Sequence, residues 1–592
     1  MSAIREIRVG LATCGVAAGA QRVHDALETS LKSAGLDLAI RRVGCVGMCY
    51  NEPLVDVVMA DGQIITYGNL SEKDVPQIVS EHLQNGQIVE EHRVETDTFL
   101  SRQVRIVLEN CGQIDPESID AYREQAGYEG LRQVLADMSC KDVIEMMTAS
   151  GLRGRGGGGF PTGLKWSLAE REESPEKYII CNADEGDPGA FMDRSVLEGD
   201  PHRVLEGMAI AAFAIGATHG IIYVRAEYPL AIARLERAIE DAHRAGLLGT
   251  DILSSAFSFD VKIKAGAGAF VCGEETALIA SIEGRRGMPR RRPPYPSTSG
   301  LWGKPTCINN VETLANVPWI VRHGADAFAA YGMGKSRGTK VFALAGKIKH
   351  SGLIEVPMGM TIREIVFDIG GGILDDRPLK AVQMGGPSGG CIPAELADTP
   401  VDYEELKKTG AIVGSGGMIV LDDTSCMVDI ARFFLDFTQK ESCGKCTFCR
   451  IGTKRMLETL GRICDGDGTL DDLAALVDLG EKIKANSLCG LGQTAPNPVL
   501  TTAKYFRDEY LAHLVDKACP AKVCRPLLRF EINPETCKDC KLCVKGCPTG
   551  AISQGGGAYQ VIDADTCVQC GRCHQVCPFG AIAIETGKVE AR

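Results

Sequence analysis

An internal duplication near the C-terminus constrains the fold of this chain more than any other feature. Residues 532–552 and 562–582 share the pattern I-(N/D)-x-(E/D)-T-C-x-x-C-x-x-C-x-x-x-C-P-x-G-A-I. A repeat of this kind predicts two similar units related by pseudo-symmetry. Each copy places four cysteines and a proline in the same register, so the fold of this segment is expected to gather thiols around two centres.

The spacing of those cysteines is that of a bacterial two-cluster ferredoxin, in which the fourth cysteine of each run ligates the other cluster. One [4Fe–4S] cluster is therefore predicted to use Cys537, Cys540, Cys543 and Cys577, and the other Cys567, Cys570, Cys573 and Cys547. The alternative, a zinc ribbon, has neither the Cys-Pro pair nor the duplication.

Cysteine usage along the rest of the chain agrees with metal or cluster ligation. The 592 residues contain 25 cysteines, many of them in short C-x-x-C runs, and no secretory signal is expected from the apolar pattern of residues 1–11. This combination favours ligation in a reducing cytoplasm over disulfides. The net charge of −13 disfavours nucleic acid as a partner. The longest apolar stretch begins near Met208 and spans only about ten residues, too few to cross a bilayer.

A third cluster site is predicted in the segment 441–450, which contains Cys443, Cys446 and Cys449. Three thiolates need a distant fourth ligand, and Cys489 is the best candidate because it too lies at a glycine-flanked helix end. Lys445, Arg450 and backbone N–H groups would offset the negative charge of a cluster. A zinc ion on the same ligands is the alternative.

Two further cysteine sets are less regular. The first comprises Cys464, His513, Cys519 and Cys524, a Cys₃His donor set that suits structural zinc. The spacing alone leaves open that these are unliganded core residues.

The second set is Cys14, Cys45 and Cys49 in the N-terminal segment. A [2Fe–2S] cluster would need four ligands, so His24, Ser30 or an outside group would have to complete it, or else the site is empty. The isolated cysteines are interpreted as small buried hydrophobic residues: Cys111, Cys140, Cys181, Cys272, Cys307, Cys391 and Cys426.

The chain divides into five predicted segments with different patterns. Residues 1–95 form a small α/β domain with a strand over 6–13, a helix over 18–34 and a hairpin at 61–62. Residues 96–334 alternate strands (178–181, 220–225) with helices such as 230–245, the pattern of an α/β domain. Residues 335–425 are strand-rich and β-grasp-like. Residues 426–528 are helical, with helices near 425–438, 452–462 and 470–485, and 529–592 hold the duplication.

A glycine-dense basic run, residues 151–166, is a candidate phosphate-binding loop. Gly154, Gly156 and Gly157 let backbone N–H groups approach a phosphate closely, and positive charge comes from Arg153, Arg155 and Lys165. Phe160 at the following turn is able to stack on a flat ligand. The run is not the G-x-G-x-x-G of ordinary dinucleotide-binding domains, and a glycine-rich loop on its own is as often a flexible hinge.

Polar residues at strand ends support a ligand site in the same segment. Asn182, Asp184 and Glu185 follow a buried strand, where α/β proteins bind ligands. Glu274 and Glu275 adjoin a second glycine turn that includes Gly273, and carboxylates there could hold ribose hydroxyls. Each acidic pair considered alone is more often a solvated turn.

These runs together resemble the NADH-oxidising flavin subunit of respiratory complex I. The matching motifs occur in order over about residues 145–500: G-L-R-G-R-G-G-x-G-F-P-T-G-L-K-W, C-N-A-D-E, C-G-E-E-T-A-L, N-N-V-E-T and E-S-C-G-K-C-T-x-C-R. The full layout resembles the longer flavin subunits of multi-subunit hydrogenases, formate dehydrogenases and transhydrogenases of anaerobes, several of which bifurcate electrons.

The resemblance implies a multi-domain α/β fold. Its parts would be a thioredoxin-like domain, a Rossmann-like FMN/NAD domain, an SLBB β-grasp module, a helical [4Fe–4S] domain and a two-cluster ferredoxin domain. It also implies that Phe160 and Tyr295 stack on the nicotinamide dinucleotide, that Glu275 lies near the adenosine ribose, and that the Cys464 set binds zinc. The implied FMN contacts are the backbone of Gly154, Arg155, Gly156 and Gly157, together with Lys165, Asn182, Asp184, Gly273, Asn309, Asn310 and Thr313.

Some positions depart from the complex I pattern. Asp187 replaces a glutamate and Tyr295 a phenylalanine, and the segment 285–292 is unusually basic. Arginines there would suit the 2′-phosphate of NADP, whereas Glu275 would repel it, and we expect NAD(H).

The expected activity is hydride exchange between NAD(H) and FMN, followed by single-electron transfer through [4Fe–4S] clusters. No side-chain acid or base is needed, so no conventional catalytic residue is expected. Expected partners in a hetero-oligomer are a small thioredoxin-like [2Fe–2S] subunit, a larger catalytic subunit and ferredoxin, the last as a second electron acceptor or donor in bifurcation. The alternatives are a diaphorase module serving one partner and a non-catalytic docking scaffold.

Overall fold

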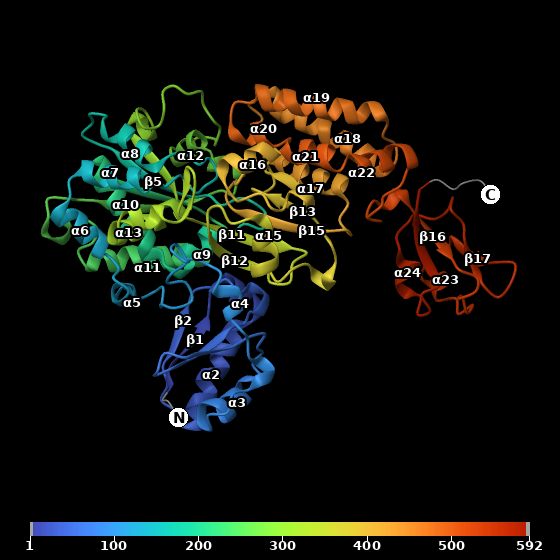
Figure 1. Cartoon of the computed structure of the whole chain (residues 1–592), viewed down its shortest axis with the longest axis horizontal. Coiled ribbons are helices and arrows are strands. Elements are labelled where there is room, and N and C mark those ends of the chain that lie inside the picture. The colour runs from blue at the N-terminus through green and yellow to red at the C-terminus, as the bar shows by residue number, and fades with distance from the viewer. Residues whose placement is uncertain (1–3, 588–592) are drawn as a thin grey trace. The chain divides into compact units, whose positions relative to one another are not determined.

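The computed structural model describes residues 4–587, and the chain separates into two compact units. The first contains Met1–Asp376, Gln383–Gly386 and Glu395–Val420, and the second contains the remainder. Both helices and strands contribute to each unit, which confirms the multi-domain mixed α/β fold expected from the sequence (Figure 1).

The N-terminal part is a four-stranded mixed sheet in the order β2-β1-β3-β4. Strand β1 (Ile4–Gly10) pairs parallel with β2 (Ile40–Val43) and antiparallel with β3 (Val55–Met59). Strands β3 and β4 (Ile64–Tyr67) form the hairpin that the sequence predicts. Helix α2 (Ala20–Ala34) buries an apolar stripe against the sheet. The remaining elements are α1 (Thr13–Ala18), η1 (Cys49–Asn51), α3 (Val75–Gln77), η2 (Ile78–Gln84) and η3 (Glu90–His92).

The predicted helix over 18–34 is present but begins only after a break. Gly19 has a φ of 111°, a conformation that favours glycine, and it separates α1 from α2. The break leaves Cys14 on the short helix α1, directly after the end of β1.

A four-stranded parallel sheet in the order β7-β6-β5-β8 forms the centre of the next segment. Its strands are β5 (Tyr178–Ala183), β6 (His219–Arg225), β7 (Asp260–Gly266) and β8 (Thr306–Asn310). The strands predicted over 178–181 and 220–225 are confirmed, as is the helix over 230–245, which is α11 (Pro229–Arg244).

Helices surround this sheet and supply most of its apolar core (Figure 1). They are α5 (Ile119–Glu124), α6 (Glu129–Asp137), α7 (Cys140–Ala149), α8 (Thr162–Glu170), α9 (Met192–Gly199), α10 (Pro201–Ile215), α12 (Glu275–Ile282), α13 (Val311–His323) and α14 (Ala325–Ala329). The short helix α4 (Asp97–Leu100) instead contacts η7 (Ile365–Ile369). Because all four strands are parallel, their carboxyl ends lie along one edge, where Asn182 and Asn310 are found.

The strand-rich segment is built on a five-stranded mixed sheet in the order β12-β11-β15-β13-β14. Strand β11 (Thr339–Gly346) pairs antiparallel with β12 (Gly352–Pro357) and parallel with β15 (Gly417–Asp422). The other elements here are β9 (Gly332–Met333), β10 (Ser336–Arg337), α15 (Ile362–Glu364), β13 (Leu379–Met384), β14 (Gly390–Pro393) and α16 (Tyr403–Thr409).

The helical segment matches its predicted elements closely. The three predicted helices are α17 (Met427–Lys440), α18 (Thr453–Asp465) and α19 (Leu470–Asn486). They pack around a single apolar cluster together with the shorter helices α21 (Asn497–Tyr505), α22 (Arg507–Leu511) and η11 (Ala512–Asp516). Helix α20 (Gly490–Thr494) contacts α19.

The duplicated segment has the internal symmetry that its repeat predicts. Strand β16 (Leu528–Ile532) pairs with β19 (Ile582–Thr586), and β17 (Ile552–Gln554) pairs with β18 (Gln560–Ile562). A five-residue helix includes the third cysteine of each copy, and these helices are α23 (Leu542–Gly546) and α24 (Arg572–Val576).

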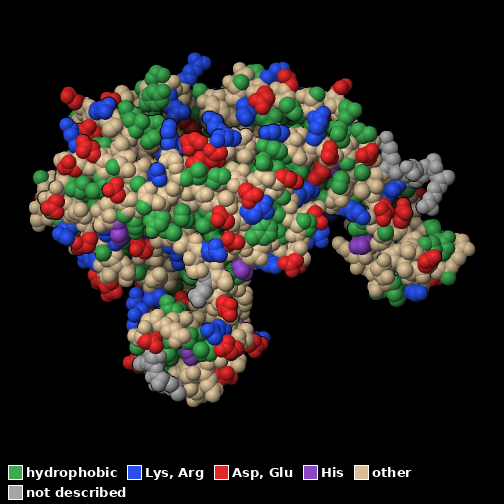
Figure 2. Space-filling view, viewed as in Figure 1, with side chains coloured by type: hydrophobic (Ala, Val, Ile, Leu, Met, Phe, Trp, Pro, Cys, Tyr) green, Lys and Arg blue, Asp and Glu red, His purple; other side chains and the backbone are tan. Residues whose placement is uncertain are grey.

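Acidic and basic side chains are interspersed over the face shown in Figure 2. No helix within residues 4–587 is both long enough and apolar enough to cross a membrane.

Candidate functional site

The glycine-rich run forms a tight loop that leads into α8. The Gly154 N–H donates to the Phe160 carbonyl at 2.8 Å, and the Thr162 N–H donates to Leu152 at 2.9 Å. Gly157 and Gly159 have φ values of 118° and 59°. A Cβ on Gly159 would lie 2.8 Å from the Tyr403 ring. The loop therefore needs glycine both for its backbone conformation and for its close packing.

The arginines of this loop bind to the protein itself. The Arg155 guanidinium is fully buried and donates to the carbonyls of Thr339 (2.9 Å), Arg153 (3.0 Å) and Arg337 (2.5 Å). Arg153 donates to the Gly159 carbonyl and pairs with Glu404 at 2.7 Å. The sequence suggests that both arginines offer charge to a ligand, but in the structure they fix the path of the loop.

The polar residues at the end of β5 have two different structural roles. Asn182 donates to the Gly273 carbonyl at 2.9 Å and accepts from the Asp184 N–H at 3.1 Å, which ties the end of β5 to the second glycine turn. The buried Glu185 carboxylate accepts from the backbone N–H groups of Asp193 (3.0 Å) and Arg194 (3.1 Å) at the start of α9. Burial raises the pKa of Glu185.

Strand β8 and α13 join the glycine loop to the same edge. The Arg155 N–H donates to the Thr313 hydroxyl at 2.8 Å, and the Trp166 indole donates to Asn309 at 3.0 Å. Asn310 caps α13 and donates to Asp193 at 2.6 Å.

Gly156 lies where the loop crosses the amino end of α13. It is exposed to solvent, unlike the buried Arg155 before it. A Cβ on Gly156 would lie 2.9 Å from the Cβ of Asn310, so any other residue would push the loop away from the helix. Gly156 therefore differs from the two arginines of the loop, because it remains exposed to solvent.

The second acidic pair is also divided between two roles. Glu274 is the N-cap of α12 and accepts from the N–H groups of Thr276 and Ala277, both at 3.0 Å. Glu275 instead pairs with Lys165 at 2.5 Å and with Arg292 at 3.5 Å. Of the two neighbours, only Glu275 faces the basic side chains of the site.

Two aromatic rings predicted to stack on a nucleotide are exposed. The side chains of Phe160 and Tyr295 are 44% and 56% exposed, unusual values for large aromatic rings. The Lys165 amine lies 6.0 Å from the centre of the Phe160 ring and also donates to the Ile308 carbonyl at 3.0 Å. The Phe160 ring and the Lys165 amine therefore lie near each other at the carboxyl edge of the sheet.

These donors fit a flavin nucleotide. A close-packed glycine backbone and an ammonium group suit a phosphate, and amide and carboxylate groups suit ribityl hydroxyls. The predicted contacts lie on the loop, in the first turns of α8 and α13, at the ends of β5 and β8 or at the neighbouring turn. They are residues 154–157, Lys165, Asn182, Asp184, Gly273, Asn309, Asn310 and Thr313.

The third predicted cluster site is brought together within the helical segment. The Leu488 N–H donates to the Cys446 sulfur at 3.4 Å. A Cβ on Gly492 would lie 3.1 Å from the Cβ of Cys449. Cys449 also contacts the Ser442 hydroxyl at 3.2 Å. The loop with Cys443, Cys446 and Cys449 therefore lies against the turn that contains Cys489.

Two small cavities in the duplicated segment group its cysteines in the crossed order. One is lined by Cys537, Cys540, Cys543 and Cys577. The other is lined by Cys567, Cys570, Cys573 and Cys547. The Ala581 N–H donates to the Cys577 sulfur at 3.4 Å, a hydrogen bond that would help to neutralise a ligated thiolate.

The Cys₃His set differs from the sequence prediction by one ligand. The donor atoms of Cys426, His513, Cys519 and Cys524 all lie within 4.8 Å of one another, and all four residues are buried. The His513 Nε2 is 3.5 Å from the Cys426 sulfur and 3.4 Å from that of Cys524.

The sequence-based interpretation of Cys426 as an isolated hydrophobic residue is wrong. It is the N-cap of α17, 87 positions before His513, so no local spacing reveals it. The predicted ligand Cys464 lies on α18 beside Cys524 but outside the four-donor set. The His513 Nδ1 contacts the Glu509 carbonyl at 2.7 Å, which directs Nε2 toward the thiols.

The other isolated cysteines agree with the hydrophobic interpretation. Cys140 is half-buried and donates to the Phe213 carbonyl at 3.2 Å. Burial raises the pKa of Cys111 and of Cys307 to about 12, so these thiols stay protonated. The buried members of the group are Cys111, Cys181, Cys272, Cys307 and Cys391.

The N-terminal cysteines form a third thiol group. The sulfurs of Cys45 and Cys49 are 3.9 Å apart, and hydrogen bonding with these two thiols lowers the pKa of Cys14. His24, suggested as a fourth ligand, instead contacts Asp25 at 3.3 Å and Glu28 at 3.8 Å. Ser30 lies still farther along α2.

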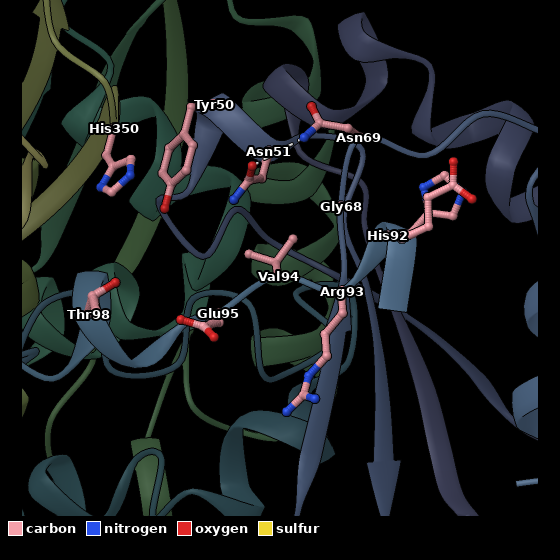
Figure 3. A pocket seen from close by; sticks show the side chains of 11 residues that line it. Tyr50, Asn51, Gly68, Asn69, His92, Arg93, Val94, Glu95, Thr98 and His350 are labelled. Atoms are coloured by element: carbon pink, nitrogen blue, oxygen red, sulfur yellow. Dashed lines mark hydrogen bonds between the residues drawn. The ribbon is translucent and has the colours of Figure 1, made fainter. Parts of the chain in front are cut away.

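A separate cavity of about 460 Å³ adjoins this segment (Figure 3). Tyr50, which follows Cys49, stacks on His350 with ring centres 4.6 Å apart, and both rings line the cavity. Asn69 donates to Asn51 at 3.2 Å across another part of its wall. The lining is polar and contains no cysteine among the described residues, so this cavity is distinct from the thiol group.

Family models match three parts of the chain. The Nuo51 FMN-binding domain matches residues 147–319, and the NADH-ubiquinone oxidoreductase-F iron–sulfur binding region matches residues 429–513. The 4Fe-4S dicluster domain matches residues 536–581. The NADP-reducing hydrogenase subunit HndC of Solidesulfovibrio fructosivorans is 58% identical over 456 residues, which cover 77% of this chain and 93% of that protein. This chain belongs to the family of NADH-binding FMN and iron–sulfur subunits.

Other members of the family extend the comparison. An NADH-quinone oxidoreductase subunit of Rhizobium meliloti is 44% identical over 415 residues, which cover 70% of this chain and 99% of that protein. A chain of the NAD⁺-reducing [NiFe]-hydrogenase in the air-oxidised state superimposes with a TM-score of 0.62 at 32% identity, covering 87% of this chain and 86% of that one. The chain is thus an oxidoreductase subunit of the long form, with FMN-binding and [4Fe–4S] domains.

Proposed function

We propose that this chain exchanges electrons between NAD(H) and FMN at the carboxyl edge of the β7-β6-β5-β8 sheet and passes them to [4Fe–4S] clusters. The observation that carries the proposal is the meeting of three features at this edge. They are the glycine loop, the Asn182–Gly273 link and the Asn309-Asn310 pair at the start of α13.

When bound, FMN converts the two-electron chemistry of a nicotinamide into single-electron transfers. The protein's part is to hold and orient the ligands. The loop backbone at 154–157 and the Lys165 ammonium bind the phosphate, while Asn182 and Asp184 bind polyol hydroxyls. Phe160 and Tyr295 present their exposed rings to the nucleotide. No side-chain acid or base is required.

The charge around Glu275 favours NAD(H) over NADP(H). Its carboxylate is held by Lys165 and Arg292, so it is fixed in place to accept hydrogen bonds from a ribose. A 2′-phosphate brought to the same position would meet a fixed negative charge. The basic segment 285–292 instead favours NADP(H). Titration with each nucleotide separately distinguishes the two possibilities.

Three [4Fe–4S] clusters and one zinc ion complete the proposed set of resident groups. The clusters are ligated by the Cys443 set with Cys489 and by the two crossed sets of the duplicated segment. Zinc is held by Cys426, His513, Cys519 and Cys524 and has a structural role. We also include a [2Fe–2S] cluster on Cys14, Cys45 and Cys49 in the thioredoxin-like domain.

The proposed setting is a cytoplasmic hetero-oligomer. A small thioredoxin-like [2Fe–2S] subunit and a larger catalytic subunit are the proposed stable partners, and ferredoxin is the second electron acceptor or donor, as in electron bifurcation. The relatives' descriptions as subunits of a hydrogenase and of a quinone oxidoreductase support such a complex. The proposed domains are those predicted from the sequence: 1–95, 96–334, 335–425 (SLBB), 426–528 and 529–592.

The first test is anaerobic titration of the purified chain with NADH and, separately, with NADPH. We expect NADH to bleach the flavin absorbance and to produce [4Fe–4S] signals in the EPR spectrum, with NADPH less effective at equal concentration. A flavin that neither nucleotide reduces would contradict the proposal.

A second test separates the ferredoxin branch from nucleotide oxidation. Replacing Cys537 and Cys577 by serine removes two ligands of one cluster in the duplicated segment. The variant is expected to keep NADH–dye activity and to lose ferredoxin reduction. Unchanged ferredoxin reduction would favour the diaphorase alternative, in which the duplicated segment is not on the electron path.

A further inference from the structure

The three thiols of the N-terminal group lie beside a buried carboxylate. Glu52 is 9% exposed, and one of its oxygens accepts from the Leu54 N–H at 3.1 Å. The same side chain lies within hydrogen-bonding reach of the Cys45 thiol. Glu52 thus presents a carboxylate oxygen beside the thiols, where the sequence supplies no fourth cysteine.

The backbone around Glu52 leaves room for its carboxylate to approach the thiols. A Cβ on Gly10 would lie 3.4 Å from a Glu52 oxygen, and one on Gly15 would lie 3.1 Å from it. Gly15 directly follows Cys14 at the start of α1. Glycine at these two positions brings the carboxylate to the end of β1, where Cys14 is held.

The Glu52 carboxyl group has no ion-pair partner within the described residues. Among residues 4–587, no lysine or arginine forms an ion pair with Glu52, and its carboxylate accepts from the Leu54 N–H. A carboxylate buried in this way is costly unless a cation or metal accompanies it. A basic group of this region, Arg194, instead contacts the Cys14 sulfur at 3.5 Å.

The spread of the sulfurs favours two metal ions over one. In a tetrahedral site with metal–sulfur bonds of about 2.3 Å, sulfurs lie about 3.8 Å apart. Cys45 and Cys49, at 3.9 Å, match two ligands of one ion. Among the described residues, Cys14, Cys45 and Cys49 do not form a set with all donors within 4.8 Å, whereas the Cys426 set does. Cys14 therefore suits a second ion.

We infer that Cys14, Cys45, Cys49 and the carboxylate of Glu52 together ligate a [2Fe–2S] cluster. The inference deepens the proposed function and rests on it for the presence of a cluster in this domain. The Gly47 N–H, which donates to the Cys45 sulfur at 3.3 Å, and Arg194 beside Cys14 would offset the charge of the ligated thiolates. An oxygen ligand should give this cluster a spectrum unlike that of an all-cysteine one.

The test uses the full chain, reconstituted anaerobically with iron and sulfide and reduced with dithionite. A reduced [2Fe–2S] cluster keeps its EPR signal at temperatures at which reduced [4Fe–4S] signals have broadened away. We expect Glu52→Gln and Cys45→Ser to lose this signal and two iron ions per chain. Glu52→Cys should retain the iron and shift the g values. Glu28→Gln, an exposed glutamate on α2, should match the wild type.

The low-temperature [4Fe–4S] signals and the bleaching of the flavin by NADH are recorded on the same samples. Their loss would mean that folding or the proposed function has failed, which is a different result from the loss of the high-temperature signal alone. Glu52→Gln with wild-type iron content and g values would overturn the inference. So would a wild-type site that contains one zinc ion and no iron.

Discussion

The buried pair of Lys340 and Glu312 should contribute more to the stability of the flavin domain than any exposed ion pair. Lys340 is 0% exposed and Glu312 1% exposed. The ammonium also donates to the carbonyls of Val341 (2.8 Å) and Ser415 (2.6 Å), and Glu312 accepts from the Val341 N–H at 2.9 Å. The pair therefore joins α13, which follows the Asn309-Asn310 pair, to β11.

Replacing Lys340 by methionine removes the charge and keeps most of the volume. Glu312 is then a buried carboxylate without its cation, and two carbonyls lose their donor. Breaking a buried pair in this way costs about 3–5 kcal/mol. With an m-value of about 3 kcal/mol per molar urea, the midpoint of unfolding should fall by roughly 1–2 M.

The assay is a urea titration at fixed FMN concentration, followed by the rise in flavin fluorescence as FMN is released. Lys349→Met is the matched control, because Lys349 pairs with Asp376 on the surface, where both side chains are exposed. The double variant Lys340→Met/Glu312→Gln removes the unpaired charge and should recover part of the loss. A Lys340→Met midpoint equal to that of Lys349→Met would refute the reasoning.

Three other predictions test separate sites. Cys426→Ser should lose bound zinc while Cys464→Ser retains it, as measured by metal analysis of the purified chains, because only Cys426 belongs to the four-donor set; equal zinc in both would contradict this. Burial raises the pKa of Asp200 to about 6, so its contribution to stability is complete below its unfolded pKa and is lost as pH rises through 6. The wild type should therefore lose about 1 kcal/mol relative to Asp200→Asn between pH 5 and 7, measured by urea titration, and parallel pH profiles would refute the assignment. Glu275→Gln should raise kcat/KM for NADPH relative to NADH roughly fivefold, because a like-charge repulsion of about 1 kcal/mol is removed. Glu274→Ala should leave that ratio unchanged and cost about 1 kcal/mol of stability through loss of a helix cap.

The fold was predictable where the sequence has a strong local period. The strands over 178–181 and 220–225 and the helix over 230–245 each differ from the observed elements by only one or two residues at their ends. The break at Gly19 was not predicted, because a glycine inside an apolar helical pattern is tolerated as often as it ends a helix.

The cysteine sites show which ligand sets the sequence spacing predicts and which depend on tertiary packing. The crossed grouping of the duplicated segment follows from short, repeated spacers and agrees with the two observed cavities. Cys426 lies 87 residues from His513, and only the packing of α17 against the end of the helical segment brings them together. The proposed ligand Glu52 has no sequence signal for a different reason, since a single glutamate after a cysteine forms no motif.

Several charged residues of the flavin-domain motifs have structural roles within the protein. Arg155 is fully buried and holds three carbonyls, while Glu185 and Glu274 accept from the first N–H groups of α9 and α12. The structure requires these three side chains whether or not they contact a ligand. Their task is to fix the loop and the helix ends, so that backbone N–H groups and the few free donors face the ligand in a set geometry. Many charged residues of these motifs therefore stabilise the loop and the helix ends. The ion pair of Lys165 and Glu275 remains at the carboxyl edge of the sheet, where the nucleotide is proposed to bind.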